Sequence, residues 1–221
     1  IMKKTSKLSM LAAVIFLLGC TVSSYAQTAK EFFSNTETSL TYLGIDYYKA
    51  RLINDPGSNN TSDIKNRLFN SMNQVVVVEP KNYDITGAFN RSNNISSDLD
   101  VVTERNEKTI ADDITSNDPA DFSRLTETDI ATEVKALNLK GKSGVGLVFI
   151  MEGMKKEEKK SYGSVWVVLL DMKTKKVLMA ERLEQEAAGF GFRNFWVSII
   201  KKSIIEINKK KYKSWKEKYG S

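Results

Sequence analysis

Two unbroken apolar runs decide the fold that this sequence predicts: Gly144-Val-Gly-Leu-Val-Phe-Ile-Met151 and Val165-Trp-Val-Val-Leu-Leu170. Runs without polar alternation are typical of strands covered on both faces, whereas a strand with one wet face alternates apolar and polar residues. We therefore expect these two strands in the middle of a sheet. The remaining segments are expected to extend or cover that sheet.

Charged turns connect these strands to each other and to a third one. Lys155-Lys-Glu-Glu-Lys-Lys160 lies between the two apolar runs, and Asp171-Met-Lys-Thr-Lys-Lys176 separates the second run from Val177-Leu-Met-Ala180. Short polar segments between apolar runs are typical of hairpin tips. The sequence therefore predicts a three-strand antiparallel meander, which leaves the core at Glu181 to Glu186.

A long amphipathic helix is predicted after the meander. Its apolar residues keep a helical period while lysines occupy the opposite side. They are Phe192, Phe195, Trp196, Ile199, Ile200, Ile204 and Ile207. We expect this helix to pack on the sheet. The segment Gly189-Phe-Gly-Phe192 before it lacks the third glycine of a dinucleotide fingerprint, so it is interpreted as a tight turn that delivers both Phe rings into the core.

Upstream of the meander, the pattern predicts a strand-helix-strand unit. Leu40 to Ile53 is rich in Tyr and Ile, which favours a strand. Thr61 to Met72 has a helix start and helical spacing of its apolar residues. Val75-Val-Val-Val-Glu79 precedes Pro80 and is interpreted as a buried strand because four β-branched residues follow one another. Such a unit implies parallel pairing through a right-handed crossover.

The region between this unit and the meander is less informative. A second helix is predicted at Leu125 to Leu139, capped by Thr126 or Thr128. No order is predicted for residues 83–124, apart from a short helix at Tyr83 to Arg91. The predicted class is therefore α/β (α+β), with one mixed sheet and a long C-terminal helix.

The first 26 residues have the pattern of an export signal. Lys3, Lys4 and Lys7 precede an apolar segment, Met10 to Leu18, that is too short for a membrane span. We therefore expect 1–26 to be a signal peptide, 27–39 a lead-in segment and 40–221 one α/β domain. The location would be periplasmic or extracellular.

Two cleavage sites compete at the end of this signal. Ser24-Tyr25-Ala26 has the small residues that signal peptidase requires, and cleavage there would release a soluble protein that starts at Gln27. Leu17-Leu18-Gly19-Cys20 resembles a bacterial lipobox, in which Cys20 would be lipidated and would anchor the protein, for example to the outer membrane. Both alternatives stay open from the sequence.

Missing residue types exclude several kinds of chemistry. The chain contains no His, and Cys20 is its only Cys. Ser-His-Asp and Cys-His nucleophile systems and His-dependent zinc sites are therefore excluded.

Gly141-Lys142-Ser143 has Ala136 where a phosphate-binding loop needs its first Gly, so it predicts a helix-to-strand turn and no nucleotide. The acidic groupings lack EF-hand spacing. We expect no catalytic residue, no metal and no cofactor.

Positive charge is concentrated at the C-terminus. The formal net charge is +6, but residues 1–26 carry three Lys and no acids and residues 201–221 carry eight Lys against two Glu, so residues 27–200 sum to −3. This split favours an interaction tail over a general nucleic-acid surface. Arg193 also stands beside a helix start, where backbone amides can hold an anion.

The basic tail has two interpretations. Lysines interleaved with Trp and Tyr are typical of a helix at an anionic membrane or glycan-phosphate surface. Alternatively, the aromatic residues continue the core stripe while the lysines keep a terminal helix soluble. The residues predicted as anion or partner contacts are Arg193, Lys209, Lys210, Lys211, Tyr212, Lys213, Trp215 and Lys216.

The order of the elements over about residues 40–207 resembles small α/β domains of exported envelope proteins. Similar domains are those of the curli-secretion channel lipoprotein, the lipoprotein activators of penicillin-binding proteins and the amino-terminal domain of the Tol translocation protein. The phrase Val165-Trp-Val-Val-Leu-Leu-Asp-Met-Lys-Thr-Lys-Lys-Val-Leu178 carries the likeness, and Tyr25-Ala26-Gln27 looks like signal endings of exported Bacteroidetes proteins. No functional residue is carried over, because no diagnostic motif is shared.

The resemblance implies a non-enzymatic interaction or assembly module. Its partner would be another envelope protein or a second copy of the chain. The alternative function is binding to an anionic membrane or glycan phosphate through the basic helix end, and the third is an exported hydrolase that uses carboxylates only.

Overall fold

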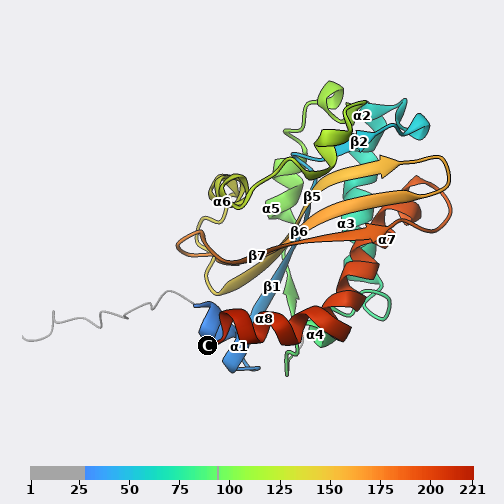
Figure 1. The fold of residues 1–221 in the computed structure, drawn as a ribbon. Helices are drawn as coiled ribbons and strands as arrows, with labels where there is room; N and C mark the ends of the chain where they lie inside the picture. Colours follow the sequence, from blue (N-terminus) through green and yellow to red (C-terminus); the bar gives the residue numbers. More distant parts are fainter. Residues whose placement is uncertain (1–27, 94) are drawn as a thin grey trace, which may run out of the picture.

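A mixed sheet runs through the molecule, with helices on both of its faces (Figure 1). The structure is a computed structural model that describes residues 28–93 and 95–221. Its strands are β1 Leu40–Asp46, β2 Arg51–Ile53, β3 Ser96–Ser97, β4 Thr115–Ser116, β5 Val145–Lys156, β6 Ser161–Asp171 and β7 Lys176–Glu186. Its α-helices are α1 Ala29–Ser34, α2 Thr61–Asp63, α3 Phe69–Val78, α4 Ile85–Ala88, α5 Asp100–Asn106, α6 Glu127–Ala136, α7 Phe192–Glu206 and α8 Tyr212–Tyr219.

The central strand is β5. On one side β6 pairs with it antiparallel over its whole length, and β7 then pairs antiparallel with β6. On the other side β1 and β2 both run parallel to β5 and occupy successive parts of it. The short strands β3 and β4 extend the sheet beyond β1 and β2. The predicted mixed sheet and its C-terminal meander are therefore confirmed.

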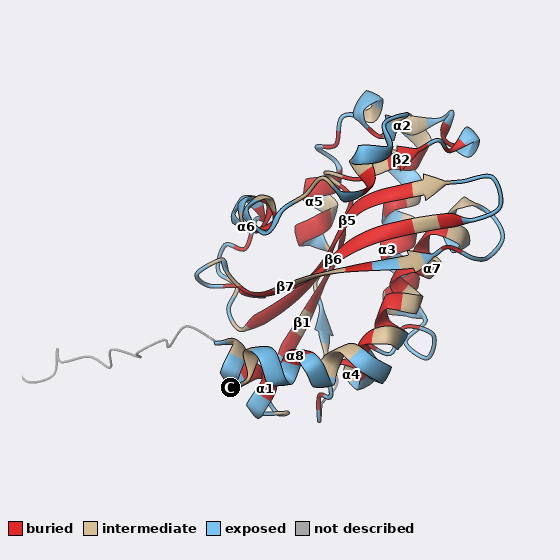
Figure 2. Cartoon of the chain, viewed as in Figure 1, coloured by how far each residue is buried: buried red, intermediate tan, exposed pale blue. Residues whose placement is uncertain are grey.

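Helices cover the two faces of the sheet unequally. One face packs against α1, α3, α4, α7 and α8, and it carries the larger hydrophobic core. The other face packs against α5 and α6 around a smaller cluster that includes Leu43, Val148 and Val168. Figure 2 shows that burial follows the central strands. The lead-in segment contains α1, whose Phe32 and Phe33 are completely buried.

The strand predicted at residues 75–79 is wrong, because Val75 to Val78 form the last turn of α3. β-branched residues favour strands only mildly, and burial in tertiary structure overrides that preference. Val75 and Val76 are buried in the larger core, while Val78 is 67% exposed. The strands that pair in parallel with β1 are therefore β5 and the short β3, both later in the chain.

The predicted strand over residues 40–53 is divided in two. The first part is β1; the backbone then leaves the sheet at Tyr47 and re-enters it as β2 after a short turn. Asn73 of α3 accepts a hydrogen bond from the Ile45 N–H and donates one to the Ile45 carbonyl. From the other face, Asn106 of α5 donates to the same carbonyl and accepts from the Tyr47 N–H. Two buried amides thus replace the sheet partners that the backbone lacks here.

Other predicted helices are confirmed. Thr126 caps α6 through a reciprocal capping box with Asp129, and the hydrogen bonds from Thr126 lower the pKa of Asp129. The short helix predicted at Tyr83 to Arg91 contains α4. The long C-terminal helix is present as α7, continues through a π-helical turn at Ile207–Lys211 and ends with α8. It packs on the sheet as expected.

We predict that Gly44→Ala strongly destabilises the fold. Gly44 has φ +107°, and an added Cβ would lie 2.5 Å from Val102 Cγ2 and 2.7 Å from Asn73 Oδ1. The expected loss is about 3 kcal/mol or more in the free energy of unfolding, measured by urea denaturation.

Gly141→Ala is the matched control. Gly141 also has positive φ, +76°, but no atom lies within 4 Å of an added Cβ. The loss there should be about 1 kcal/mol, from backbone strain alone. Equal losses in the two variants would contradict close packing of α3 and α5 around Gly44.

Candidate functional site

Lysines line the outer face of the C-terminal helix. Lys209 and Lys210 lie in the π-helical turn, Lys213 and Lys216 lie in α8, and all four are exposed. None of them makes an ion pair with a described residue. Lys211 differs, because its Nζ lies 3.5 Å from Glu206 Oε1. We call Lys209, Lys210, Lys213 and Lys216 the basic face.

The aromatic residues of the same helix point inward. Trp215 is 3% exposed and belongs to the larger core. The Tyr212 ring lies 5.6 Å from that of Phe33, and its hydroxyl accepts a hydrogen bond from Arg91. This arrangement fits the second interpretation of the basic tail, in which Tyr212 and Trp215 continue the apolar side of the helix that faces the core. Their rings pack inside the domain, so the predicted contacts on this helix that stay exposed are lysines.

Arg193 does not lie with the basic face. It stands at the first turn of α7, and about 16 helical residues separate it from Lys209, which at 1.5 Å per residue is roughly 24 Å. The predicted contact residues therefore form two separate surfaces.

The surface around Arg193 contains an aromatic residue that sequence reasoning assigned to the core. Phe190 is 94% exposed, so the expectation that both Phe rings of Gly189-Phe-Gly-Phe192 enter the core is wrong for Phe190. Phe192 is half-buried against the core. The turn has Gly189 at φ +122° and Gly191 at φ +76°. Both angles lie in the region that favours glycine, and no periodicity in the sequence signals that Phe190 between them is exposed.

Two hollows flank Phe190. One, of about 430 Å³, is lined by residues of the turn together with Arg67, Asp63 and Arg193. The other, of about 270 Å³, is lined by Lys156, Phe195 and Trp196 beside the same turn. Arg67 is held by a bidentate ion pair with Asp63, at 2.7 Å for each contact. We call Phe190, Arg67 and Arg193 the aromatic end.

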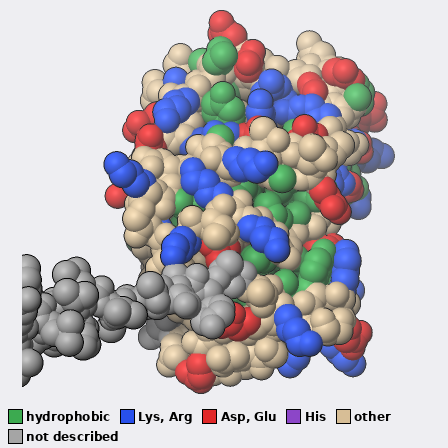
Figure 3. Space-filling model, turned by 90° about the vertical axis from the view of Figure 1, so that its left-hand side faces the viewer, with side chains coloured by type: hydrophobic (Ala, Val, Ile, Leu, Met, Phe, Trp, Pro, Cys, Tyr) green, Lys and Arg blue, Asp and Glu red, His purple; other side chains and the backbone are tan. Residues whose placement is uncertain are grey.

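A further hollow, of about 550 Å³, surrounds the Gly141-Lys142-Ser143 turn between α6 and β5. The turn joins a helix to a strand, as predicted. Four lysines line this hollow: Lys140, Lys142, Lys173 and Lys175. Two of them bind protein groups, since Lys142 pairs with Asp98 and Lys175 donates to the carbonyl of Leu137. Figure 3, which views the side that carries α6, shows basic side chains scattered with apolar ones between them.

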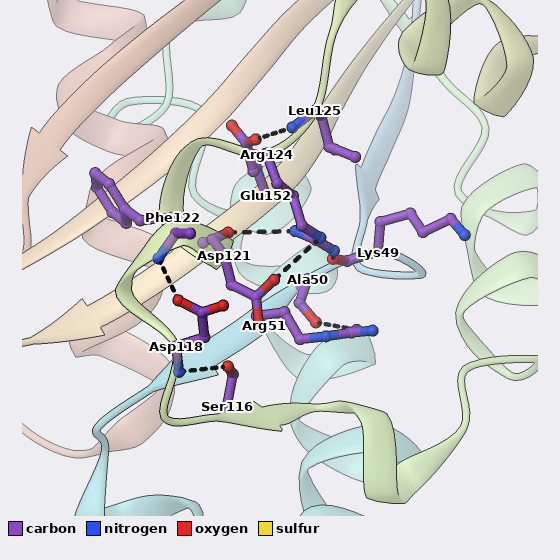
Figure 4. A network of polar contacts seen from close by, with 12 residues as sticks. Lys49, Ala50, Arg51, Ser116, Asp118, Asp121, Phe122, Arg124, Leu125 and Glu152 are labelled. Atoms are coloured by element: carbon purple, nitrogen blue, oxygen red, sulfur yellow. Dashed lines mark hydrogen bonds and ion pairs between the residues drawn. The ribbon is translucent and has the colours of Figure 1, made fainter.

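Buried carboxylates face cations. Glu152 of β5 is completely buried and lies 2.7 Å from Arg182 Nε, while its second oxygen accepts from the Leu125 N–H at 2.5 Å. Figure 4 shows Glu152 reaching the Leu125 backbone, and Arg124 extending from Asp121 to the backbone of Lys49. These contacts tie the segment before α6 to the sheet.

A second buried cluster joins β1 to α5 and α6. Arg105 lies 2.8 Å from Asp46 and also pairs with Glu133, and its guanidinium stacks over the Tyr48 ring at 4.2 Å. Burial raises the pKa of Asp46 above its usual range, although Arg105 and the Tyr48 N–H act to lower it. Asp55 is held similarly, by Lys156 at 2.7 Å and by the indole N–H of Trp196.

Neither a metal site nor a membrane span emerges from residues 28–93 and 95–221. No group of three or more potential ligand side chains there is placed to hold a metal ion. No helix there combines the length and the apolar character needed to cross a bilayer. The predicted signal peptide and Cys20 lie outside the described residues, so export and lipidation stay predictions.

Comparison with known proteins yields little. No family model matches the chain, and no curated protein matches it. Among solved structures, the crystal structure of lipoprotein GNA1162 from Neisseria meningitidis is similar over 76% of this chain and 96% of that one. The identity is 10% and the TM-score 0.29. A likeness this weak carries no argument about this chain.

We predict that Arg182→Met lowers the free energy of unfolding by about 3 kcal/mol or more, because it leaves the Glu152 carboxylate buried without its cation. The double variant Glu152→Met/Arg182→Met should recover most of that loss. Urea denaturation measures both. Lys160→Met breaks an exposed pair with Glu186 and serves as the control, with a loss below about 1 kcal/mol. A double variant no more stable than the single one would contradict the assignment.

Proposed function

We propose that this chain is an exported, non-enzymatic protein of the cell envelope that acts as an interaction module. Export rests on the signal pattern of residues 1–26. The partner would be another envelope protein or a second copy of this chain, and it would bind at the aromatic end. The observation that carries the proposal is the exposure of Phe190.

Phe190 has the properties of an interface anchor. Large aromatic side chains and Arg are enriched at the centres of protein interfaces, where they contribute most of the binding free energy. Here an aromatic ring is 94% exposed and two Arg side chains stand in the adjacent hollow. Burying such a ring in a partner would remove a large apolar surface from water.

Two hydrogen bonds tether the chain just before the turn that carries Phe190. The Ala188 N–H donates to Ser198 Oγ at 2.9 Å, and the Ala187 N–H donates to the Ser161 carbonyl at 2.7 Å. Ala187 itself is buried. A ring presented on a tethered turn loses less conformational freedom on binding than one on a free loop, which favours affinity.

The charged groups support binding over catalysis. A carboxylate-dependent hydrolase needs two carboxylates that face each other across a cleft. The four buried carboxylates described above face Lys or Arg side chains instead. The hollow that contains Asp98 and Asp100 also contains Lys142, which pairs with Asp98. Such pairs hold structure together.

Cross-linking tests this proposal. A photoreactive phenylalanine at position 190 should form one discrete adduct in native envelopes, while the same group at position 110 should form none. Ile110 is the matched control because it is 61% exposed and apolar but lies outside the aromatic end. Absence of an adduct at 190 in a protein that sediments as a monomer would overturn the proposal.

We predict that Phe190→Ser weakens the resulting complex about thirtyfold or more in Kd, as for an interface residue worth about 2 kcal/mol. Ile110→Ser should leave the Kd unchanged. Neither substitution should alter the thermal unfolding midpoint, because both side chains are exposed. Unchanged affinity for Phe190→Ser would show that the adduct formed by proximity alone.

A further inference from the structure

We propose that the basic face docks on an anionic lipid bilayer and sets the orientation of the protein at the membrane. This surface is distinct from the aromatic end and goes beyond the protein-binding function proposed there. The inference stands on the free lysines, on the packing behind them and on where the described chain begins.

The lysines form one surface. Lys209, Lys213 and Lys216 recur at spacings of four and three, which places them along one side of a helix, and Lys210 lies next to them. All four ammonium groups are exposed without an ion pair to a described residue, whereas Lys218 pairs with Glu181 at 2.8 Å. Glu217 is the single acidic residue of α8. The outer surface therefore has an excess of positive charge, which complements anionic headgroups.

The helix behind the lysines is held firmly. Trp215 is buried, and the Tyr219 ring stacks on Phe33 with ring centres 6.2 Å apart. The Tyr219 hydroxyl also donates to Glu181 Oε1 at 2.7 Å. The lysines therefore project from a fixed helix and need no folding step before they meet a surface. Binding would be electrostatic, since the apolar side of α8 is already covered by the domain.

The start of the described chain lies beside this helix. α1 packs on α8 through Phe33, and Figure 1 shows the two helices side by side. Eight peptide units join Cys20 to Thr28, a reach of at most about 28 Å. A lipid on Cys20 would thus keep the basic face close to the bilayer. The basic face would add electrostatic attraction to such an anchor and would favour one side of the domain for contact with the headgroups.

The aromatic end lies at the other end of α7 from the basic face. α7 separates the two surfaces, with Phe190 before its first residue and the basic face after its last. Its 15 residues span about 22 Å. A partner bound at Phe190 would therefore not compete with the lipid for the same surface.

Vesicle co-sedimentation tests the inference. The full chain carries Cys20→Ser in every arm, so that no lipid chain contributes. Vesicles contain either about one-third phosphatidylglycerol in phosphatidylcholine or phosphatidylcholine alone. We expect binding to the anionic vesicles only, and we expect it to fall steeply with added salt.

The decisive variant replaces Lys209, Lys210, Lys213 and Lys216 with Gln. Each lysine near an anionic surface strengthens binding by about fivefold, so this variant should bind at least about twentyfold more weakly. The control replaces four other exposed lysines with Gln, so that both variants lose the same amount of net charge. They are Lys135, Lys140, Lys159 and Lys173. It should bind like the parent protein. Circular dichroism verifies that both variants are folded.

Three results would overturn the inference. They are no binding of the parent protein to anionic vesicles, an equal loss of vesicle binding in the two variants, and a loss of vesicle binding in the control variant alone. The last would assign lipid binding to the lysines of the control set, of which Lys140 and Lys173 line the hollow around Gly141. None of these results bears on Phe190, because the cross-linking experiment reads a different surface. The two proposals can therefore fail independently.

Discussion

The structure depends on how the chain is held where β1 leaves the sheet. Asn73 and Asn106 approach this point from opposite faces and bind the backbone of Ile45 and Tyr47. A buried backbone group without a partner is destabilising, so the two amides allow the strand to break in the interior. Gly44 permits the close approach of both helices. The break lets β1 and β2 share one side of β5, and the helical layers are positioned around it.

Charge is divided sharply between the inside and the surface of this domain. Carboxylates inside, such as Asp46 and Glu152, are paired with Arg and serve to connect segments distant in sequence. Pairs of this kind are costly to break and add little net stability, so their role is to specify how the segments fit together. Several lysines on the surface, in contrast, make no ion pair with any residue that the structure describes. One group of these lysines lies at the C-terminal helix, and the exposed ring of Phe190 lies at the opposite end of α7.

Several features were predictable because they depend on local sequence patterns. The meander follows from apolar runs separated by charged turns, and the capping of α6 follows from Thr126 and Asp129. Sequence alone misassigned Val75 to Val78 and Phe190. In the first case helical packing against the core outweighed β-branched preference, and in the second Phe190 lies in a turn between two glycines with positive φ. Both outcomes depend on contacts or dihedral angles that no spacing encodes.

The sequence by itself determined the α/β class, the long C-terminal helix and the concentration of lysines at its end, since periodicity and charge are properties of the chain. Only the tertiary structure decided which of those residues are available. It buried Trp215, separated Arg193 from the basic face and left Phe190 exposed. The physical reason is that accessibility depends on which surfaces pack together, and here α1, from the lead-in segment, covers the aromatic side of α8.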